Sequence, residues 1–362
     1  MAELSELIEL CRFAGERFDL VQASGGNASF RLPDGTLWIK AAGKALSEVS
    51  TEKDLCHVSL EKPLQFLTKN KLSTDLSNDD IDRDATDCLQ SAISTDSNGI
   101  QPSNETFMHC LLGPVTLHTH PPVVTSIVCQ RGWRDRISAL IPNAIYIDYH
   151  TPGVRLALAL AQELKKANRQ AGELTVIFLQ NHGLVVSGGS SGEVASGTND
   201  VVAKLSYFLG VDWSRYRLSN RISELILSTT GNLVCSYYCE DRILLDAVRR
   251  NHSVLLAQPV FPDQLVYAGP AGLELTSLDD EKPLFNYIER YGQLPRVILY
   301  KASSDHLFVV AETMRRCREI EQVLKAHALT LLTASIPYVQ FLQDDELIYL
   351  MNWEAERYRQ SV

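Results

Sequence analysis

The spacing of apolar residues predicts a helix and then a β-hairpin at the start of the chain. Within residues 3–17 the apolar side chains recur every three or four positions, as on one face of a helix. Residues 23–32 begin as a Gly-rich turn and continue as a strand, and residues 36–40 form its antiparallel partner after Pro33-Asp34-Gly35. The turn Gly25-Gly26-Asn27 either provides a positive φ or cradles an anion with its amides, and both interpretations remain open.

The middle of the chain alternates helices and strands, which predicts an α/β fold. A helix is expected from residue 102 or 103 to 112, where Ser103 could act as its cap, and further helices over 122–129 and 154–166. Strands are expected over 115–120, 144–149, 175–179 and 184–187. The last two of these strands are joined by a tight turn that displays His182.

The last third of the chain predicts a second α/β region. Short apolar runs indicate strands near residues 253–256, 264–268, 296–301 and 307–310, followed by helices over 313–333 and 344–359. We therefore predict two domains, over residues 1–235 and 236–362.

Composition and charge narrow the class of protein. The 362 residues are 45% hydrophobic, which is a normal value for a globular chain, and the formal net charge is -10. The absence of a Lys/Arg run argues against nucleic acid or an anionic membrane surface as the main partner. No signal-peptide pattern or long apolar stretch occurs, so we expect a cytoplasmic protein. The eight cysteines lack the density of a disulfide scaffold.

Three histidines are candidate metal ligands. His118 and His120 lie two apart on a predicted strand, so their imidazoles point to the same face. His182 lies in the turn Asn181-His182-Gly183. Three imidazoles with an open position are typical of a catalytic zinc site, whereas structural zinc usually has four ligands rich in cysteine. We therefore predict that these histidines bind Zn²⁺ or another divalent transition metal.

Five segments resemble, in their order, the motifs of the class II aldolase and adducin family. They are Gly26-Asn27-Ala28-Ser29, the strand ending in Ala42-Gly43, Ser103-Asn104-Glu105 with His109 one turn on, His118-Thr119-His120-Pro121, and Asn181-His182-Gly183. The resemblance covers roughly residues 1–210. It implies an α/β/α sandwich with a mainly antiparallel central sheet, usually assembled as a homo-tetramer with active sites between subunits.

The resemblance also implies residue roles. His118, His120 and His182 match the family's zinc ligands, and Glu105 matches its acid/base carboxylate, which can also approach the metal when no substrate is bound. Tyr149 matches a tyrosine that could donate a proton across a subunit interface, although a packed strand aromatic is an equal interpretation. The positions at which the family holds the substrate phosphate are Asn27, Ser29, Gly43, Ser103 and Asn104.

Two departures from the family pattern alter the expected phosphate site. Ala42 stands where a hydroxyl residue is common, and Asn104 replaces the second of two adjacent serines, so each removes one hydroxyl donor. Lys40 or Lys44 could compensate with positive charge. The site suits a phosphorylated sugar, and an unphosphorylated or larger substrate is the alternative. Apolar walls and a nearby anion are expected to raise the pKa of Glu105.

These residues favour a metal-dependent aldolase, a carbon–carbon lyase. It would cleave a ketose or ketose phosphate by retro-aldol chemistry through an enediolate stabilised by zinc, with Glu105 moving the proton. An epimerase, dehydratase or decarboxylase with the same site is the first alternative. A non-catalytic adducin-like interaction protein is the second, and the complete histidine set with Glu105 speaks against it.

The C-terminal third resembles the region after the aldolase motifs in bifunctional rhamnulose-phosphate aldolase/dehydrogenases. The similarity includes Phe261-Pro262-Asp263 and the closing Asn352-Trp353-Glu354-Ala355-Glu356. No Gly-x-Gly-x-x-Gly sequence opens a helix, so we do not expect a dinucleotide domain. We expect a C-terminal α/β extension that acts as a lid, interface or specificity element.

Overall fold

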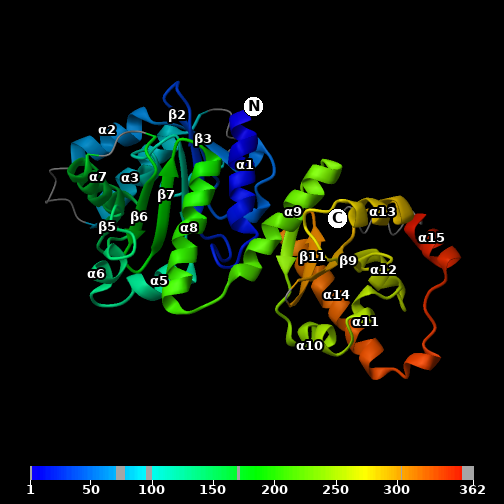
Figure 1. The fold of residues 1–362 in the computed structure, drawn as a ribbon. Helices are drawn as coiled ribbons and strands as arrows, with labels where there is room; N and C mark the ends of the chain where they lie inside the picture. The colour runs from blue at the N-terminus through cyan, green and yellow to red at the C-terminus, as the bar shows by residue number, and fades with distance from the viewer. Residues whose placement is uncertain (1, 71–77, 95–99, 169–171, 303, 353–362) are drawn as a thin grey trace. The chain divides into compact units, whose positions relative to one another are not determined.

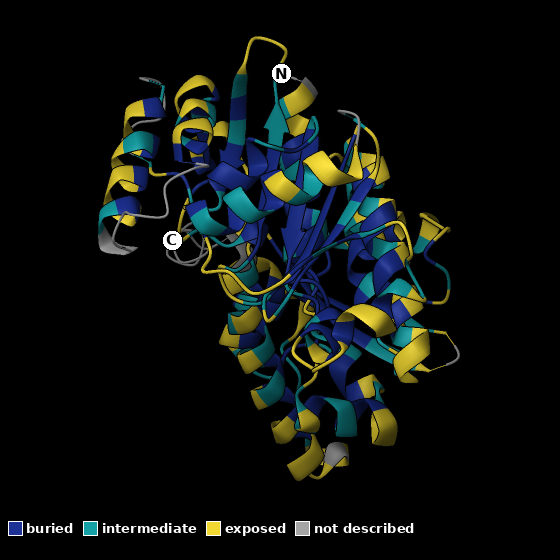
Figure 2. Ribbon diagram, turned by 90° about the vertical axis from the view of Figure 1, so that its left-hand side faces the viewer, coloured by how far each residue is buried: buried dark blue, intermediate teal, exposed yellow. Residues whose placement is uncertain are grey.

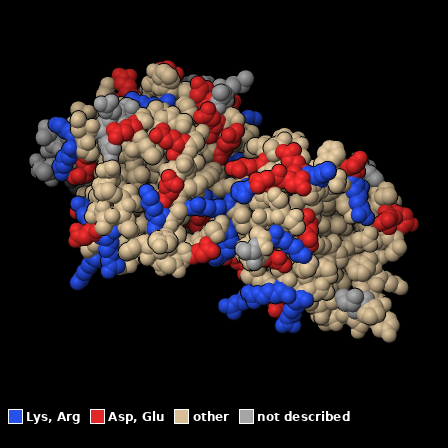
Figure 3. Space-filling model, in the orientation of Figure 1, with Lys and Arg blue, Asp and Glu red and all other residues tan. Residues whose placement is uncertain are grey.

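The computed structural model describes residues 2–70, 78–94, 100–168, 172–302 and 304–352 (Figure 1). The chain divides into two compact units, Met1–Trp213 and Ser214–Val362. Within the described residues, no helix has both the length and the apolar composition that crossing a bilayer requires. On the face drawn in Figure 3, acidic and basic side chains occur on both units.

A seven-stranded sheet forms the centre of the first unit. Its spatial order is β3-β2-β1-β4-β7-β6-β5, and every neighbouring pair is antiparallel except β5 and β6. The predicted mainly antiparallel sheet is therefore confirmed. The strands are β1 (Asn27–Arg31), β2 (Thr36–Lys40), β3 (Leu55–Ser59), β4 (Val115–Thr119), β5 (Ile145–Ile147), β6 (Thr175–Leu179) and β7 (Gly183–Gly188).

Helices cover both faces of this sheet, because successive strand residues point to opposite sides. In β7, Leu184 and Val186 pack into the core on one face, whereas Val185 packs into the core on the other. The strands are accordingly buried while the helices expose their outer sides (Figure 2). One face is covered by α1 (Ala2–Gly15), α5 (Pro122–Val128), α6 (Trp133–Ser138) and α8 (Ser191–Leu209), and the other by α2 (Glu61–Asn70), α3 (Asn78–Ala92), α4 (Thr106–His109) and α7 (Val154–Ala167).

The predicted α/β/α sandwich is thus confirmed, with one shorter helix than expected. The helix expected to run from residue 102 or 103 to 112 is the four-residue α4, and Ser103 Oγ accepts a hydrogen bond from the Glu105 N–H at 3.3 Å. Strand β4 lies between β1 and β7, so His118 is paired with Asn27 on one side and Val185 on the other. This central position buries the end of β4, where the predicted metal ligands begin.

The second unit is also a layered α/β structure. Its four-stranded sheet has the order β8-β11-β10-β9, in which only β9 and β10 are parallel. Helices α9 and α13 pack on one face, and α10, α11 and α14 pack on the other. The elements are β8 (Cys235–Tyr238), β9 (Leu273–Leu275), β10 (Val297–Lys301), β11 (Asp305–Ala311), α9 (Arg217–Thr230), α10 (Arg242–Asn251), α11 (Ser253–Leu256), α12 (Pro262–Ala268), α13 (Lys282–Tyr291), α14 (Met314–Thr333) and α15 (Asp344–Asn352).

The C-terminal α/β extension is confirmed, but two of its predicted strands are wrong. Residues 253–256 and 264–268 form the helices α11 and α12. A short apolar run does not distinguish a strand from a buried helix, and Pro262 at the first turn of α12 favours the helix. The boundary expected between residues 235 and 236 falls inside β8, whereas α9 packs in the core of the second unit. Residues 353–359 of the last predicted helix lie outside the described residues.

Candidate functional site

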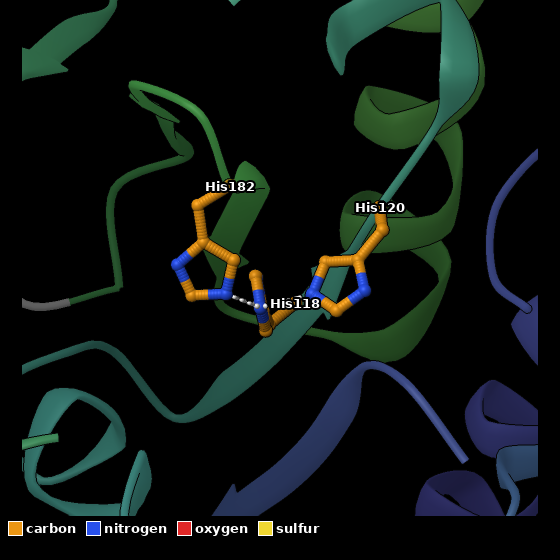
Figure 4. A group of neighbouring side chains, drawn as sticks. All are labelled: His118, His120 and His182. Atoms are coloured by element: carbon orange, nitrogen blue, oxygen red, sulfur yellow. Dashed lines mark hydrogen bonds between the residues drawn. The ribbon is translucent and has the colours of Figure 1, made fainter. Parts of the chain in front are cut away.

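Three imidazoles meet at the end of β4. His118 lies in β4, His120 follows it directly, and His182 lies in the turn between β6 and β7 (Figure 4). Because β4 pairs with β7 up to the Thr119–Leu184 pair, this turn falls beside the end of β4. His118 Nε2 lies 2.9 Å from His120 Nε2 and 3.2 Å from His182 Nε2. The three ligand atoms all lie within 4.8 Å of one another.

The geometry of the three imidazoles fits a divalent metal. His118 Nδ1 donates to the Leu184 carbonyl oxygen at 3.0 Å, which leaves the Nε2 lone pair available to a metal. Burial, and then the neighbouring His118 and His182, lower the pKa of His120 to about 3, so its imidazole is neutral. Tetrahedral zinc at ~2.0–2.1 Å would hold ligand nitrogens about 3.3 Å apart, close to the two spacings of 2.9 and 3.2 Å from His118 Nε2.

Glycines allow the segments around the histidines to approach closely. A Cβ on Gly183 would lie 2.3 Å from the Thr119 carbonyl oxygen and 3.0 Å from His120 Cδ2. Gly26 has φ +76°, and a Cβ there would lie 2.7 Å from the His118 carbonyl oxygen. The positive φ expected at the Gly25-Gly26-Asn27 turn is thus confirmed at Gly26, and the turn also meets the backbone of the strand that carries His118, which the sequence did not indicate.

We expect Gly183→Ala to weaken both the fold and the metal site. The added methyl group meets backbone, which cannot rotate away, so the turn carrying His182 must move from β4. Strain of this kind costs about 1–3 kcal/mol of unfolding free energy. Chemical denaturation and zinc titration would measure both effects. Gly192→Ala is the matched control, since a Cβ there meets nothing within 4 Å, and an equal effect in both variants would contradict this explanation.

Glu105 lies beside the histidines. Its Oε1 is 3.1 Å from His182 Nε2 and 3.5 Å from His118 Nε2, and its Oε2 accepts a hydrogen bond from Asn27 Nδ2. Burial alone would raise the pKa of Glu105, but His118 and His182 outweigh it and hold this pKa well below its usual range. The expectation of a raised pKa is therefore wrong, because imidazoles rather than an anion are the nearest charged groups. Burial alone would lower the pKa of His118, but Glu105 and the hydrogen bond to the Leu184 carbonyl oxygen together raise it.

Ser29, predicted to bind phosphate, is buried against a fourth histidine. Its Oγ lies 2.7 Å from His109 Nδ1, and its exposed fraction is 1%. His109 is fully buried, and burial lowers its pKa to about 3, so the imidazole is neutral. The motif series includes His109, but no pattern in the sequence indicated a role for it.

Three segments predicted to hold a phosphate are tied together. The buried Lys40 donates from Nζ to the carbonyl oxygens of Ser24 at 3.2 Å and Lys44 at 2.5 Å, which links the loops before β1 and after β2. The Ala42 N–H donates to the Gln101 carbonyl oxygen at 2.8 Å, so the loop after β2 also meets the segment that leads to residues 103–105. The structure therefore brings the Asn27, Gly43 and Ser103-Asn104 segments together, although they are far apart in sequence.

Asp54 holds the loop after β2 in place and makes the stability of the fold depend on pH. Burial would raise the pKa of Asp54, but Lys44 and the N–H groups of Ser50 and Thr51 lower it from 3.8 to about 2. Between pH 2 and pH 4, Asp54 is therefore protonated less often in the folded state than in the unfolded chain. The stabilisation is present above pH 4 and is lost as the pH falls towards 2.

We expect Asp54→Asn to cost about 2 kcal/mol of unfolding free energy at pH 7, because its hydrogen bonds to charged and buried groups weaken. The difference from the unsubstituted protein should shrink between pH 4 and pH 2. Urea denaturation at several pH values would measure it. Asp148→Asn, at an exposed ion pair with Arg134, is the control and should change stability by less than about 0.5 kcal/mol.

Tyr149 lies apart from the histidine cluster. Its side chain is 55% exposed, and its backbone N–H donates to Gln180 Oε1 at 3.0 Å. Among the described residues, no hydrogen bond joins Tyr149 to His118, His120 or His182. A role for Tyr149 within one chain therefore has no support in these contacts.

Two histidines of the second unit make local contacts. His327 Nε2 donates to the Val254 carbonyl oxygen at 2.9 Å, and burial lowers the pKa of His327 to about 4. His252 Nε2 lies 3.1 Å from Lys301 Nζ. Among the described residues, His118, His120 and His182 form the one group with the spacing of a metal site.

Comparison with known proteins identifies the class that this fold and site define. The profile described as "Class II Aldolase and Adducin N-terminal domain" matches residues 5–198. The chain belongs to this family. Comparison with curated proteins gave no match.

Solved structures with similar folds include class II aldolases. A class II aldolase domain from Thermoplasma acidophilum is 23% identical, with 57% of this chain and 93% of that chain covered and a TM-score of 0.47. The candidate aldolase/epimerase/decarboxylase YgbL from Escherichia coli is 22% identical, with 59% and 93% covered and a TM-score of 0.40. L-Fuculose-1-phosphate aldolase from Thermus thermophilus is 16% identical, with 57% and 94% covered and a TM-score of 0.38.

Proposed function

We propose that this protein is a zinc-dependent aldolase that cleaves a ketose or ketose phosphate into an aldehyde and a smaller ketone. The observation that carries the proposal is the convergence of three imidazole Nε2 atoms with the Glu105 carboxylate 3.1–3.5 Å from two of them. Imidazole nitrogens are ligands that suit Zn²⁺, which we propose as the metal. Bound zinc would supply the positive charge that stabilises negative charge on the substrate oxygens as the carbon–carbon bond breaks.

Glu105 is the proposed acid/base group. Its contacts with His118 and His182 keep the carboxylate ionised, which is the form that can accept a proton from the substrate. The hydrogen bond from Asn27 leaves Oε1 facing the imidazoles, so one oxygen is oriented by the protein and the other serves the reaction. This division of roles between the two oxygens supports a proton-transfer function in addition to contact with a metal.

We propose a phosphorylated sugar as the substrate. Lys40 is 2% exposed and, within the described residues, makes no ion pair within 4 Å, so an anion nearby would offset a buried positive charge. Asn27, Gly43, Ser103 and Asn104 lie on the segments that Lys40 and Ala42 tie together. The open space beside Gly43, where a Cβ would meet nothing within 4 Å, is consistent with room for a ligand.

We also propose a homo-oligomer, and a tetramer by family resemblance. The exposed Tyr149 would then reach the site of a neighbouring subunit, where it could donate a proton. Sedimentation analysis of the full chain tests the assembly, and a monomer would remove this role from Tyr149.

The experiment that tests the proposed reaction is incubation of the zinc-loaded protein with a panel of ketose 1-phosphates. Release of an aldehyde, detected by coupled reduction, is the expected result. An isomerised, dehydrated or decarboxylated product without aldehyde would replace the aldolase proposal by one of those activities. No reaction together with no metal binding would favour a non-catalytic adducin-like interaction protein.

A further inference from the structure

His109 and Ser29 form a buried pair beside Glu105 that metal binding does not explain. On β1, Asn27 and Ser29 are two residues apart and point to the same face. On the α4 segment, Glu105 and His109 are four residues apart and also share a face. Asn27 contacts Glu105 and Ser29 contacts His109, so strand and helix are joined by two parallel side-chain pairs.

Because α4 is short, the contact between Ser29 and His109 can determine how the α4 segment is oriented. Helix α4 contains four residues, too few to hold a fixed orientation by its own hydrogen bonds. The direction of the Glu105 side chain must therefore come from contacts with other elements. The bond between Asn27 and Glu105 fixes one end of the segment, and the Ser29–His109 pair fixes the other.

Packing alone does not explain an imidazole at position 109. The residue is fully buried, and within the described part of the chain its Nε2 has no hydrogen-bond partner. An orphaned buried polar atom costs about 1–3 kcal/mol, which an apolar side chain of similar size would avoid. The feature that the imidazole contributes is the 2.7 Å contact between Nδ1 and Ser29 Oγ.

We propose that His109 is a positioning residue, which through its Nδ1 bond to Ser29 holds the α4 segment so that Glu105 faces the three histidines. Ser29 thus acts from within the protein rather than on the substrate phosphate. The proposal rests on the proposed function in taking Glu105 as the proton-transfer group.

The test compares His109→Asn with His109→Gln, because the two amides place their polar atoms differently. The Asn amide lies where Nδ1 lies and can keep the bond to Ser29, whereas the longer Gln amide extends towards the Nε2 position. If His109 served only to fill space, His109→Gln would be the better tolerated variant, because glutamine is closer in size to histidine. Ser29→Ala removes the same bond from the strand side and changes little volume.

Cobalt is the first probe, since its visible spectrum reports the surroundings of the bound ion without any substrate. Glu105 Oε1 lies 3.1 Å from the ligand atom of His182, so displacement of Glu105 should change that spectrum. We expect His109→Gln and Ser29→Ala to shift the cobalt bands in the same way as Glu105→Gln, while His109→Asn keeps the original spectrum. If His109→Gln does not fold, Ser29→Ala decides the question alone.

Proton exchange is the second probe. The hydrogens on C3 of dihydroxyacetone phosphate exchange with D2O when a base removes them, and NMR follows this without carbon–carbon cleavage. We expect a rate about 10–100-fold lower in His109→Gln and Ser29→Ala, and within about threefold of the original in His109→Asn.

The outcomes separate this inference from the proposed function. No exchange by the unsubstituted protein would count against the proposed function, and the cobalt spectra would still test the role of His109. The inference would be overturned if the cobalt spectrum of His109→Gln matched the original spectrum as closely as, or more closely than, that of His109→Asn. An unchanged cobalt spectrum in Ser29→Ala would also overturn it.

Discussion

Replacing His118 by alanine should abolish stoichiometric zinc binding. His118 has no exposed surface and its Nδ1 is anchored to the Leu184 carbonyl oxygen, so it is the most firmly held of the three candidate ligands. Loss of a partner that only orients a ligand reduces metal affinity by about 10–100-fold, and loss of the ligand itself should cost more than ~100-fold. Metal analysis after dialysis would measure about one zinc per chain in the unsubstituted protein and almost none in the variant.

Thermal denaturation provides a second measurement of the same prediction. Zinc at one hundred times its dissociation constant should stabilise the unsubstituted protein by about 2.7 kcal/mol and leave His118→Ala unaffected. His252→Ala is the control, because His252 lies in the second unit and should leave zinc binding unchanged. Full zinc retention by His118→Ala would remove His118 from the ligand set.

Glu105→Gln should lower the turnover number by about 10²–10⁴-fold while zinc content stays the same. Glutamine can still accept the hydrogen bond from Asn27, but it cannot take up a proton, and general acid–base catalysis contributes a factor of this size. The assay is aldehyde release from the ketose phosphate that the unsubstituted protein cleaves, with zinc measured on the same samples.

The exposed Glu61 gives the control for this prediction, and Glu61→Gln should retain full turnover. Turnover of Glu105→Gln within tenfold of the original would show that another group moves the proton. Parallel loss of zinc and activity would instead make Glu105 a metal-holding residue.

The three candidate metal ligands could be predicted because each follows from a short-range rule. Alternation along residues 115–120 placed His118 and His120 on one side, and a turn between two apolar strands displayed His182. That these two places meet depends on the pairing of β4 with β7, which the sequence pattern alone does not specify. The family resemblance supplied this long-range information.

The partners of the site residues could not be predicted, because they come from side-chain geometry between distant segments. The Leu184 carbonyl oxygen that orients His118, and the pair formed by Ser29 and His109, leave no signal in residue type or spacing. The predicted direction of the Glu105 pKa shift was wrong for the same reason, since the shift depends on which charged groups lie nearest to the carboxylate. Strand predictions at 253–256 and 264–268 failed because apolar runs of four or five residues suit a helix equally well.

X-ray absorption at the zinc edge of the zinc-loaded full chain tests the central claim most directly. We expect nitrogen and oxygen ligands at about 2.0–2.1 Å, with the outer-shell scattering of three imidazoles, and we expect one imidazole fewer in any form of His182→Ala that still binds zinc. Sulfur ligands at about 2.3 Å, or fewer than three imidazoles in the unsubstituted protein, would contradict a metal site built from His118, His120 and His182.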